Sequence, residues 1–313
     1  MTQPLVLGID IGGTNTSFGI VNRRGEIVTK GSMSTTGHPS TTDYFAAMKQ
    51  VLTPLIDEFG KENINGIGIG APNGNFFTGE IVFAPNLPWR GVIPIAKTVT
   101  DMLGIKATLT NDANAAAIGE MMYGAAKGMK DFILVTLGTG VGSGFVANGQ
   151  MIYGHDGFAG ELGHVIAVRD GRKCGCGRLG CLEAYASATG IVRTANEWLE
   201  QRNTETSLRK NKGSLTAKMI QEAADQGDSF ALELFDYTGK ILGQTLADMV
   251  AITSPEAIIF FGGLAQAGDL LLGPVHRYME ENMLNIFQNK VALLQSALPD
   301  ADAAILGASA LAW

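Results

Sequence analysis

Residues 7–20 read Leu-Gly-Ile-Asp-Ile-Gly-Gly-Thr-Asn-Thr-Ser-Phe-Gly-Ile, and residues 133–146 read Ile-Leu-Val-Thr-Leu-Gly-Thr-Gly-Val-Gly-Ser-Gly-Phe-Val. In both stretches an apolar strand ends in a small polar residue, a glycine-rich turn follows, and a second strand begins. An offset of 126 residues aligns the two, with Asp10 over Thr136. Repetition at the length of a domain predicts two related lobes with a cleft between them.

Strands and helices are expected to alternate around these two hairpins. Apolar spacing and turn residues predict strands at residues 5–9, 17–21, 27–31, 64–69 and 107–110, and helices at 41–59, 96–103 and 113–123. Beyond the second hairpin they predict helices near 185–201, 216–225 and 229–251, a strand at 257–261 and a final helix ending near residue 313. We therefore expect an α/β protein with an N-terminal lobe over residues 1–113 and a C-terminal lobe over residues 114–313, the last helix returning to the N-terminal lobe.

The composition excludes several broad classes of protein. Of 313 residues, 41 are glycine, well above the usual share of about 7%, but they lack the three-residue period of collagen. A hydrophobic content of 46% against 17% charged residues is unlike a disordered chain. The glycines gather in clusters, which indicates backbone that turns tightly or approaches a ligand closely.

Charge and hydropathy indicate a soluble protein that binds neither nucleic acid nor membrane. The net charge of −7 has the wrong sign for a general nucleic-acid binder. Residues 132–154 are uncharged and long enough to span a bilayer, but their six glycines are more typical of a hairpin. Because the first residues contain no basic segment, we expect no signal peptide and a cytoplasmic location.

Two glycine-rich turns are candidates for binding phosphate. Gly12-Gly13-Thr14-Asn15 joins two strands, and Gly138-Thr139-Gly140-Val141-Gly142 has the equivalent place in the repeat. Glycine lets backbone N–H groups approach phosphate oxygens, and Asp10 beside the first turn could hold a hydrated Mg²⁺. Neither turn is a Walker loop or a Rossmann fingerprint. One such turn could be an ordinary glycine turn, whereas two copies facing a cleft favour nucleotide binding.

All three cysteines lie in one short segment whose spacing is typical of a zinc site. Cys174, Cys176 and Cys181 fall within eight residues, and His164 lies ten residues upstream. Three thiolates and an imidazole form a tetrahedral zinc set, and the intervening glycines let the chain wrap around a metal. The alternatives are reduced core cysteines or a disulfide, although a Cys-x-Cys disulfide would be strained. Four protein ligands leave no position for a catalytic water, so we expect a structural Zn²⁺.

Several amides and carboxylates could hold a polyhydroxyl ligand. Asn111 and Asp112 close a strand and open an alanine-rich helix, whose N-terminus would keep the Asp112 carboxylate ionised. Asp112 could also serve as the helix cap. The other candidates are Asn86, Glu161, His164 and Glu183. Each taken singly is typical of a surface or capping residue, but planar groups converging on a cleft would satisfy the donors and acceptors of a sugar.

Taken together, these motifs resemble the ROK family of repressors, open reading frames and sugar kinases. The matching segments occur in the right order at residues 7–15, 111–115, 137–142, 160–164 and 174–183. The last two read Gly-Glu-Leu-Gly-His and Cys-Gly-Cys-Gly-Arg-Leu-Gly-Cys-Leu-Glu, and they are the most specific part of the resemblance. It implies two duplicated ribonuclease H-like lobes of the actin/hexokinase type, whose closure around the cleft would exclude water.

The resemblance also implies a role for each matched residue. Asp112 matches the catalytic base that takes a proton from the sugar 6-hydroxyl as that oxygen attacks the γ-phosphate of ATP. The sugar-binding positions match Asn86, Asn111, Asp112, Glu161, His164 and Glu183. The phosphate and Mg²⁺ loops match Asp10, Gly12, Gly13, Thr14, Gly138, Thr139 and Gly140, and the adenosine side matches Gly262 and Gly263. His164 would serve the sugar through one ring nitrogen and zinc through the other.

The expected activity is ATP-dependent phosphorylation of a hexose, with glucose as the leading substrate and with Mg²⁺, structural Zn²⁺ and a homodimer as further expectations. Residues 70–74 read Gly-Ala-Pro-Asn-Gly where many family kinases have Gly-x-Pro-Gly, in a loop that lines the sugar site. N-acetylglucosamine, N-acetylmannosamine, mannose, fructose and allose are therefore alternative substrates. A non-catalytic sugar-sensing regulator is a further alternative, but the intact Asp112 and phosphate loops disfavour it. The first expected strand leaves no room for the N-terminal helix-turn-helix of regulatory members.

Overall fold

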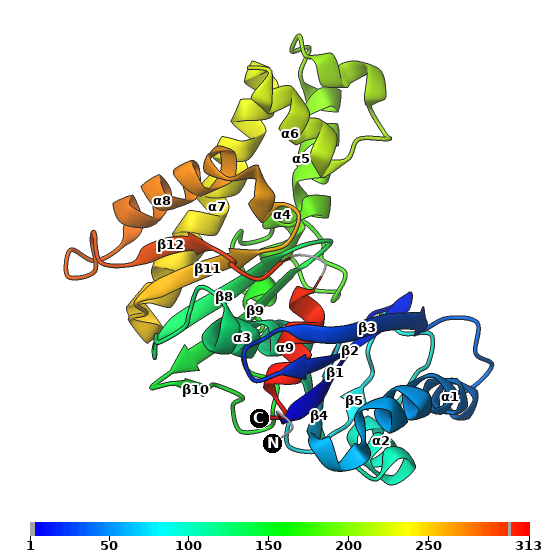
Figure 1. Cartoon of the computed structure of the whole chain (residues 1–313). Helices are drawn as coiled ribbons and strands as arrows, with labels where there is room; N and C mark the ends of the chain where they lie inside the picture. Colours follow the sequence, from blue (N-terminus) through cyan, green and yellow to red (C-terminus); the bar gives the residue numbers. More distant parts are fainter. Residues whose placement is uncertain (1–3, 300–301) are drawn as a thin grey trace. The chain divides into compact units, whose positions relative to one another are not determined.

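The computed structural model describes residues 4–299 and 302–313. Contacts within the chain group these residues into two compact units. Unit 1 comprises Met1–Gly128, Met151–Ala159 and Ala297–Trp313, and unit 2 comprises Met129–Gln150 and Gly160–Ser296. Each unit is built on a five-stranded sheet (Figure 1).

The sheet of unit 1 has the strand order β3-β2-β1-β4-β7. Its strands are β1 (Leu5–Ile11), β2 (Asn15–Asn22), β3 (Ile27–Ser34), β4 (Ile64–Ala71) and β7 (Ala107–Asn111), and β5 (Ile81–Val82) pairs with β6 (Val92–Ile93) in a separate hairpin. β1 is antiparallel to β2 but parallel to β4, and β4 is parallel to β7. The carboxyl ends of β1, β4 and β7 therefore lie at one edge of the sheet.

Helices cover both faces of this sheet. They are α1 (Thr41–Phe59), α2 (Ile95–Leu103), α3 (Asp112–Tyr123) and α9 (Ala303–Ala310), with the short 3₁₀ helix η1 (Lys61–Asn63) after α1. Tyr44 and Leu52 of α1 and Val99 of α2 share a core with the apolar strand residues. On the opposite face α9 packs against β1, β2, β4 and α3. The close contact between α9 and β4 requires glycine at position 68, because a Cβ there would lie 1.8 Å from the Ala308 carbonyl oxygen.

Unit 2 repeats the strand topology of unit 1. Its sheet has the order β10-β9-β8-β11-β12, with β8 (Phe132–Leu137), β9 (Val141–Ala147), β10 (Gln150–Met151), β11 (Ala257–Phe261) and β12 (Ala292–Gln295). β8 is antiparallel to β9, and β11 is parallel to both β8 and β12. In both sheets the strands, taken in chain order, are arranged third, second, first, fourth, fifth. The predicted duplicated α/β fold is thereby confirmed.

The helices of unit 2 form its large core together with the sheet. They are α4 (Glu183–Ala186), α5 (Ala188–Gln201), α6 (Ala217–Asp225), α7 (Ser229–Thr253) and α8 (Asp269–Asn282), with the 3₁₀ helices η2 (Leu162–His164), η3 (Ser207–Asn211) and η4 (Ala265–Ala267). The longest, α7, packs along α8 and buries Phe230, Leu234 and Phe235 (Figure 1).

The structure differs from the sequence prediction at several elements. The single helix expected at 185–201 is wrong: Ser187 is extended, and its Oγ accepts the N–H of Gly190 at 2.9 Å, which ends α4 and caps α5. The prediction omitted α8, whose interior contains Gly273 and Pro274, two residues that usually interrupt helices. It also omitted the two-residue strands and β12, none of which carries a long apolar alternation.

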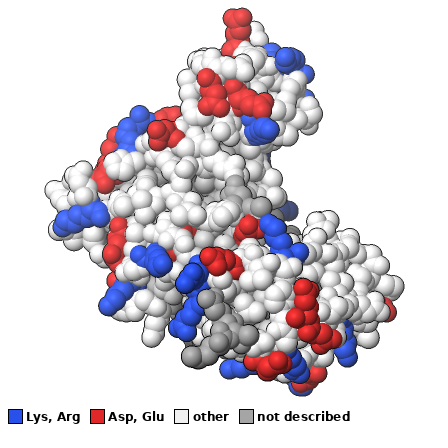
Figure 2. Space-filling view, in the orientation of Figure 1, with Lys and Arg blue, Asp and Glu red and all other residues white. Residues whose placement is uncertain are grey.

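On the face drawn in Figure 2, basic and acidic side chains are interspersed. Among the helices of residues 4–299 and 302–313, none has both the length and the apolar character that crossing a bilayer requires.

Candidate functional site

Two of the predicted carboxylates lie at the same edge of the unit 1 sheet. Asp10 is close to the end of β1, and Asp112 follows β7 as the first residue of α3. Gly70 of β4 lies between them, since a Cβ there would be 3.6 Å from Asp10 Oδ1 and 3.9 Å from the Asp112 Cα. The parallel strands β1, β4 and β7 lie side by side in that order, and so they bring together two acids that are far apart in the sequence.

The surroundings of these two acids favour their neutral forms. Burial raises the pKa of Asp10 to about 7, and the neighbouring charge of Asp112 adds to the rise. Burial also raises the pKa of Asp112, against backbone N–H groups, including that of Ala113, which lower it. Water reaches the Asp112 side chain, which limits the effect. A cation or a shared proton at this edge would relieve the repulsion between the two carboxylates.

Asn111, and not Asp112, is the N-cap of α3. The N–H of Ala113 donates to Asn111 Oδ1 at 2.9 Å and to Asp112 Oδ1 at 2.8 Å. Since Asp112 is the first helical residue, its carboxylate lies at the positive end of the helix dipole, which favours ionisation and so opposes the rise in its pKa that burial causes. The sequence had left Asp112 as a possible cap, and the structure gives that position to Asn111.

The first glycine turn lies against the segment that contains Asn86. The N–H of Gly12 donates to the Asn15 carbonyl at 2.9 Å and closes the turn. A Cβ at Gly13 would lie 2.5 Å from the Asn86 carbonyl oxygen, so only glycine allows this contact. Thr14 is exposed at the tip. Unit 1 thus brings the predicted phosphate turn and one predicted sugar residue together.

The second glycine turn is held by the residues around it in unit 2. The N–H of Gly138 donates to the Gly140 carbonyl at 3.0 Å, and the N–H of Ala188 at the start of α5 donates to the Gly138 carbonyl at 2.9 Å. Gly262, at a φ of 100°, packs against Leu137, where a Cβ would lie 2.8 Å from the carbonyl oxygen. Gly262 and Gly263 therefore lie at the base of this turn.

The four predicted zinc ligands form a compact cluster. The ligand atoms of His164, Cys174, Cys176 and Cys181 all lie within 4.8 Å of one another. The sulfurs of Cys176 and Cys181 are 3.7 Å apart, close to the edge of about 3.8 Å in a tetrahedron with Zn–S bonds of about 2.3 Å. All three thiols are free. The donor set and its spacing fit a zinc ion.

The His164 ring connects this cluster to a predicted sugar residue. Its Nδ1 faces Cys174 Sγ at 3.8 Å, and its Nε2 is 4.0 Å from a carboxylate oxygen of Glu161. The buried hydroxyl of Ser143 on β9 holds the Glu161 loop, because it donates to the Gly160 carbonyl and accepts the Leu162 N–H. The two nitrogens of His164 are thus available for two different tasks.

A cavity of about 630 Å³ opens beside the second glycine turn. It is lined by Thr139, by Leu215, Thr216 and Ala217, and by the α5 residues Ala188, Thr189, Val192, Arg193, Asn196, Glu197 and Glu200. The Thr189 hydroxyl donates to the Thr139 carbonyl at 2.8 Å, which ties the turn to the cavity wall. This volume is in the range of small-molecule sites.

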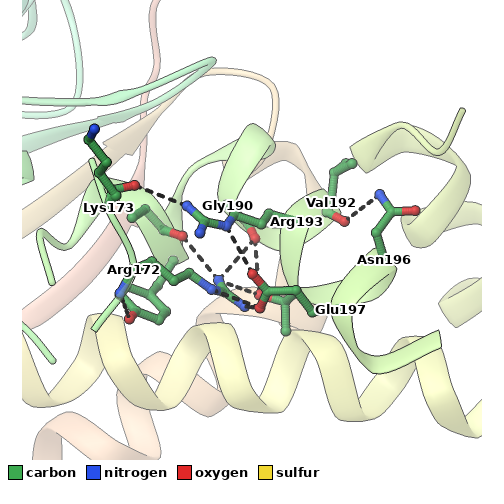
Figure 3. A network of polar contacts seen from close by, with 10 residues as sticks. Arg172, Lys173, Gly190, Val192, Arg193, Asn196 and Glu197 are labelled. Carbon is green, nitrogen blue, oxygen red and sulfur yellow. Dashed lines mark hydrogen bonds and ion pairs between the residues drawn. The ribbon is translucent and has the colours of Figure 1, made fainter. Parts of the chain in front are cut away.

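A polar network joins the cavity wall to the cysteine loop (Figure 3). Arg172, just before Cys174, donates to Glu197 Oε2 through Nε at 3.0 Å, and its Nη1 reaches the Ala184 carbonyl and the Thr194 hydroxyl. Arg193 donates to Glu197 Oε1 at 2.9 Å and to the Lys173 carbonyl at 3.0 Å. Glu197 is thereby held by two guanidinium groups, and the loop is fixed to α5.

Apart from Thr139, the sequence prediction did not single out the cavity residues, and it did not single out Ser143. One signal was present, because Thr189, Arg193, Asn196 and Glu200 recur at spacings of three and four and so share a helix face. Such a polar face is also typical of a solvated helix, and only the fold shows that Leu215–Ala217 closes the other side.

Comparisons with known proteins show what this chain is similar to. A "Glucokinase" of Halalkalibacterium halodurans is 39% identical over 288 residues, which are 90% of this chain and 86% of that protein. A "Glucokinase" of Thermotoga maritima is 34% identical over 99% of this chain and 98% of its own length. A crystal structure of a ROK family glucokinase from Streptomyces griseus, in complex with glucose and AMPPNP, matches with a TM-score of 0.78 at 32% identity, covering 98% of both chains. Residues 6–313 match the family model for the ROK family, and the chain belongs to that family.

Proposed function

We propose that this protein is an ATP-dependent kinase that phosphorylates glucose at its 6-hydroxyl. The observation that carries the proposal is the convergence of Asp10, Asp112 and a glycine turn at one sheet edge, in a chain similar to glucokinases over nearly its full length. Phosphoryl transfer requires mainly positioning and charge neutralisation; backbone N–H groups of the turn would position the phosphates, and a Mg²⁺ ion held by Asp10 would neutralise their charge.

Asp112 is the general base of the proposed reaction. Its carboxylate takes the proton of the sugar 6-hydroxyl while that oxygen forms a bond to the γ-phosphorus of ATP. The bond from the γ-phosphorus to the β–γ bridging oxygen breaks, and ADP leaves. Asn111 fixes the start of α3 and so the position of Asp112. Asp10 would hold Mg²⁺, which would neutralise phosphate charge when bound.

The remaining predicted residues of unit 1 would bind the two substrates. Backbone N–H groups at Gly12, Gly13 and Thr14 would face phosphate oxygens. Asn86 would bind the sugar. Because it also contacts Gly13, it would fix the position of the sugar relative to the phosphate turn.

The unit 2 residues would hold the rest of both substrates. Glu161, His164 and Glu183 would accept and donate hydrogen bonds to sugar hydroxyls. Gly138, Thr139 and Gly140 would contact ATP phosphates, and Gly262 and Gly263 would lie on the adenosine side. The cavity beside Thr139 has the size for the nucleoside.

We also propose a structural zinc held by His164 Nδ1 and the three thiolates. Zinc would orient the imidazole, so that Nε2 meets the sugar.

Free thiols and the use of ATP fit the cytoplasm, where thiols stay reduced. The family resemblance implies a homodimer, and light scattering on the purified protein measures its oligomeric state.

A panel of sugars tests the proposed function. ADP release is measured with glucose, mannose, fructose, allose, N-acetylglucosamine and N-acetylmannosamine, and compared as kcat/KM. We expect glucose to give the highest value, because buried polar groups discriminate strongly against a sugar that leaves them unpaired. Higher kcat/KM for another sugar would reassign the substrate, and sugar-independent ADP release alone would contradict the kinase proposal.

A further inference from the structure

The Glu183 carboxylate contacts the second glycine turn. Its Oε2 accepts the N–H of Val141 at 3.1 Å, and a Cβ at Gly140 would lie 2.2 Å from the same oxygen. The other oxygen, Oε1, is 3.6 Å from Cys174 Sγ. A side chain proposed above to bind sugar thus occupies the turn proposed above to bind phosphate.

This contact has an electrostatic consequence for nucleotide binding. The Val141 N–H points to the carboxylate and not to open solvent, so one donor of the turn is already taken. A phosphate group arriving at Gly138–Val141 meets a negative charge of its own sign. Sugar hydroxyls that donate hydrogen bonds to Glu183 would disperse that charge and compete with Val141 for the carboxylate oxygens.

We propose that Glu183 obstructs the phosphate turn until a sugar binds, so that sugar binding raises the affinity for nucleotide. Glu183 then has a second role beside sugar binding, because its charge lies on the turn that phosphate would occupy. The inference rests on the proposed function, which assigns sugar to Glu183 and phosphate to the turn.

Calorimetric binding of Mg-AMPPNP to the full chain tests the inference. In the wild-type protein, saturating glucose is expected to raise the affinity for AMPPNP by about 5–150-fold, the usual range of coupling between sites. AMPPNP must raise the affinity for glucose by the same factor, because linkage is reciprocal. Equal AMPPNP affinity with and without glucose, in a protein that phosphorylates glucose, overturns the inference and leaves the proposed function intact.

The Glu183→Gln variant separates obstruction from a structural role. Removal of the charge is expected to raise AMPPNP affinity in the absence of glucose toward the glucose-saturated wild-type value, while glucose binding weakens. A merely structural role predicts the opposite, a loss of AMPPNP affinity, and that result overturns the inference.

Glu161→Gln is the matched control. It removes the same charge from another proposed sugar residue, next to His164 and outside the Val141 contact. Glucose binding is expected to weaken, while AMPPNP affinity in the absence of glucose stays at the wild-type value. An equal rise of AMPPNP affinity in both variants would show a general charge effect and overturn the specific role of Glu183. A wild-type protein that phosphorylates no hexose overturns the proposed function and this inference with it.

Discussion

At the scale of single residues, similar carboxylates have different surroundings, and we propose different roles for them. Asp10 and Asp112 share a sheet edge, where burial raises the pKa of both. The Glu183 carboxylate instead accepts the backbone N–H of Val141 in the second glycine turn. Side-chain type alone predicts none of these differences, because each depends on which backbone groups the fold places beside the carboxylate.

A cysteine substitution tests the proposed zinc site. Cys174→Ser replaces a thiolate ligand with a hydroxyl that binds zinc poorly, so we expect zinc to be lost. Because His164 Nδ1 faces Cys174 Sγ, the ring should also lose its orientation, and the KM for glucose should rise by about 10–100-fold. Elemental analysis and steady-state kinetics measure the two effects.

Lys173→Ala is the control for that experiment, since it changes a neighbouring side chain but keeps the Lys173 carbonyl that Arg193 binds. It should retain one zinc per chain. A wild-type protein that is fully active without metal would contradict the zinc assignment.

Residue identities at the site were predictable where the signal is local in sequence. The zinc set follows from spacing within 18 residues, from His164 to Cys181, and the structure gathers all four side chains. Which ring nitrogen faces the thiols was not predictable, because it depends on the path of the loop through η2. The capping role of Asn111 was missed for a similar reason, since adjacent Asn and Asp are equally good caps.

At the scale of elements, Asp228 anchors the long helix α7. Its Oδ1 accepts the N–H groups of Phe230 and Ala231, and its Oδ2 accepts three bonds from Thr206 and Ser207. We expect Asp228→Ala to cost about 1–2 kcal/mol of stability, as for other lost caps. Calorimetric melting of the two proteins measures the difference, and an unchanged melting temperature would contradict the anchoring role.

The stability that Asp228 contributes is expected to fall in acid. Burial alone would raise the pKa of Asp228, but the hydrogen bonds from Thr206, Ser207 and Ala231 outweigh it and lower the pKa. A carboxyl group whose pKa is lowered by folding stabilises the protein above its unfolded pKa of about 4, and that contribution is lost as the pH falls further. The melting difference between wild type and Asp228→Asn should therefore be constant near neutral pH and shrink below about pH 4. A difference that grows in acid would contradict this assignment.

Elements with marked ends were predicted most accurately. The helix at 41–59 has the predicted bounds because Ser40 caps it and Gly60 follows it. The strand at 257–261 is also as predicted, since it is a short buried apolar run before two glycines. By contrast, α8 contains Pro274 and is stabilised by packing on α7, which the sequence does not show.

At the scale of the whole molecule, the repeat of a glycine hairpin predicted two related lobes, and the structure contains two sheets with the same strand order. Of the proposed site residues, Asp10, Asn86 and Asp112 lie in unit 1, and Glu161, His164 and Glu183 lie in unit 2. The cavity was not predictable, because its walls come from α5 and from residues 215–217, which the chain brings together only after η3.

The central claim is that Asp112 is the base of a glucose 6-kinase. The most direct test is ³¹P NMR of the products formed from glucose and ATP by the wild type and by Asp112→Asn, with glucose affinity measured by calorimetry. We predict that the wild type forms glucose phosphorylated at the 6-position, and that Asp112→Asn turns over about 10²–10⁴-fold more slowly while still binding glucose. Near wild-type turnover in Asp112→Asn, or a phosphoryl group at another position of the sugar, would contradict the account.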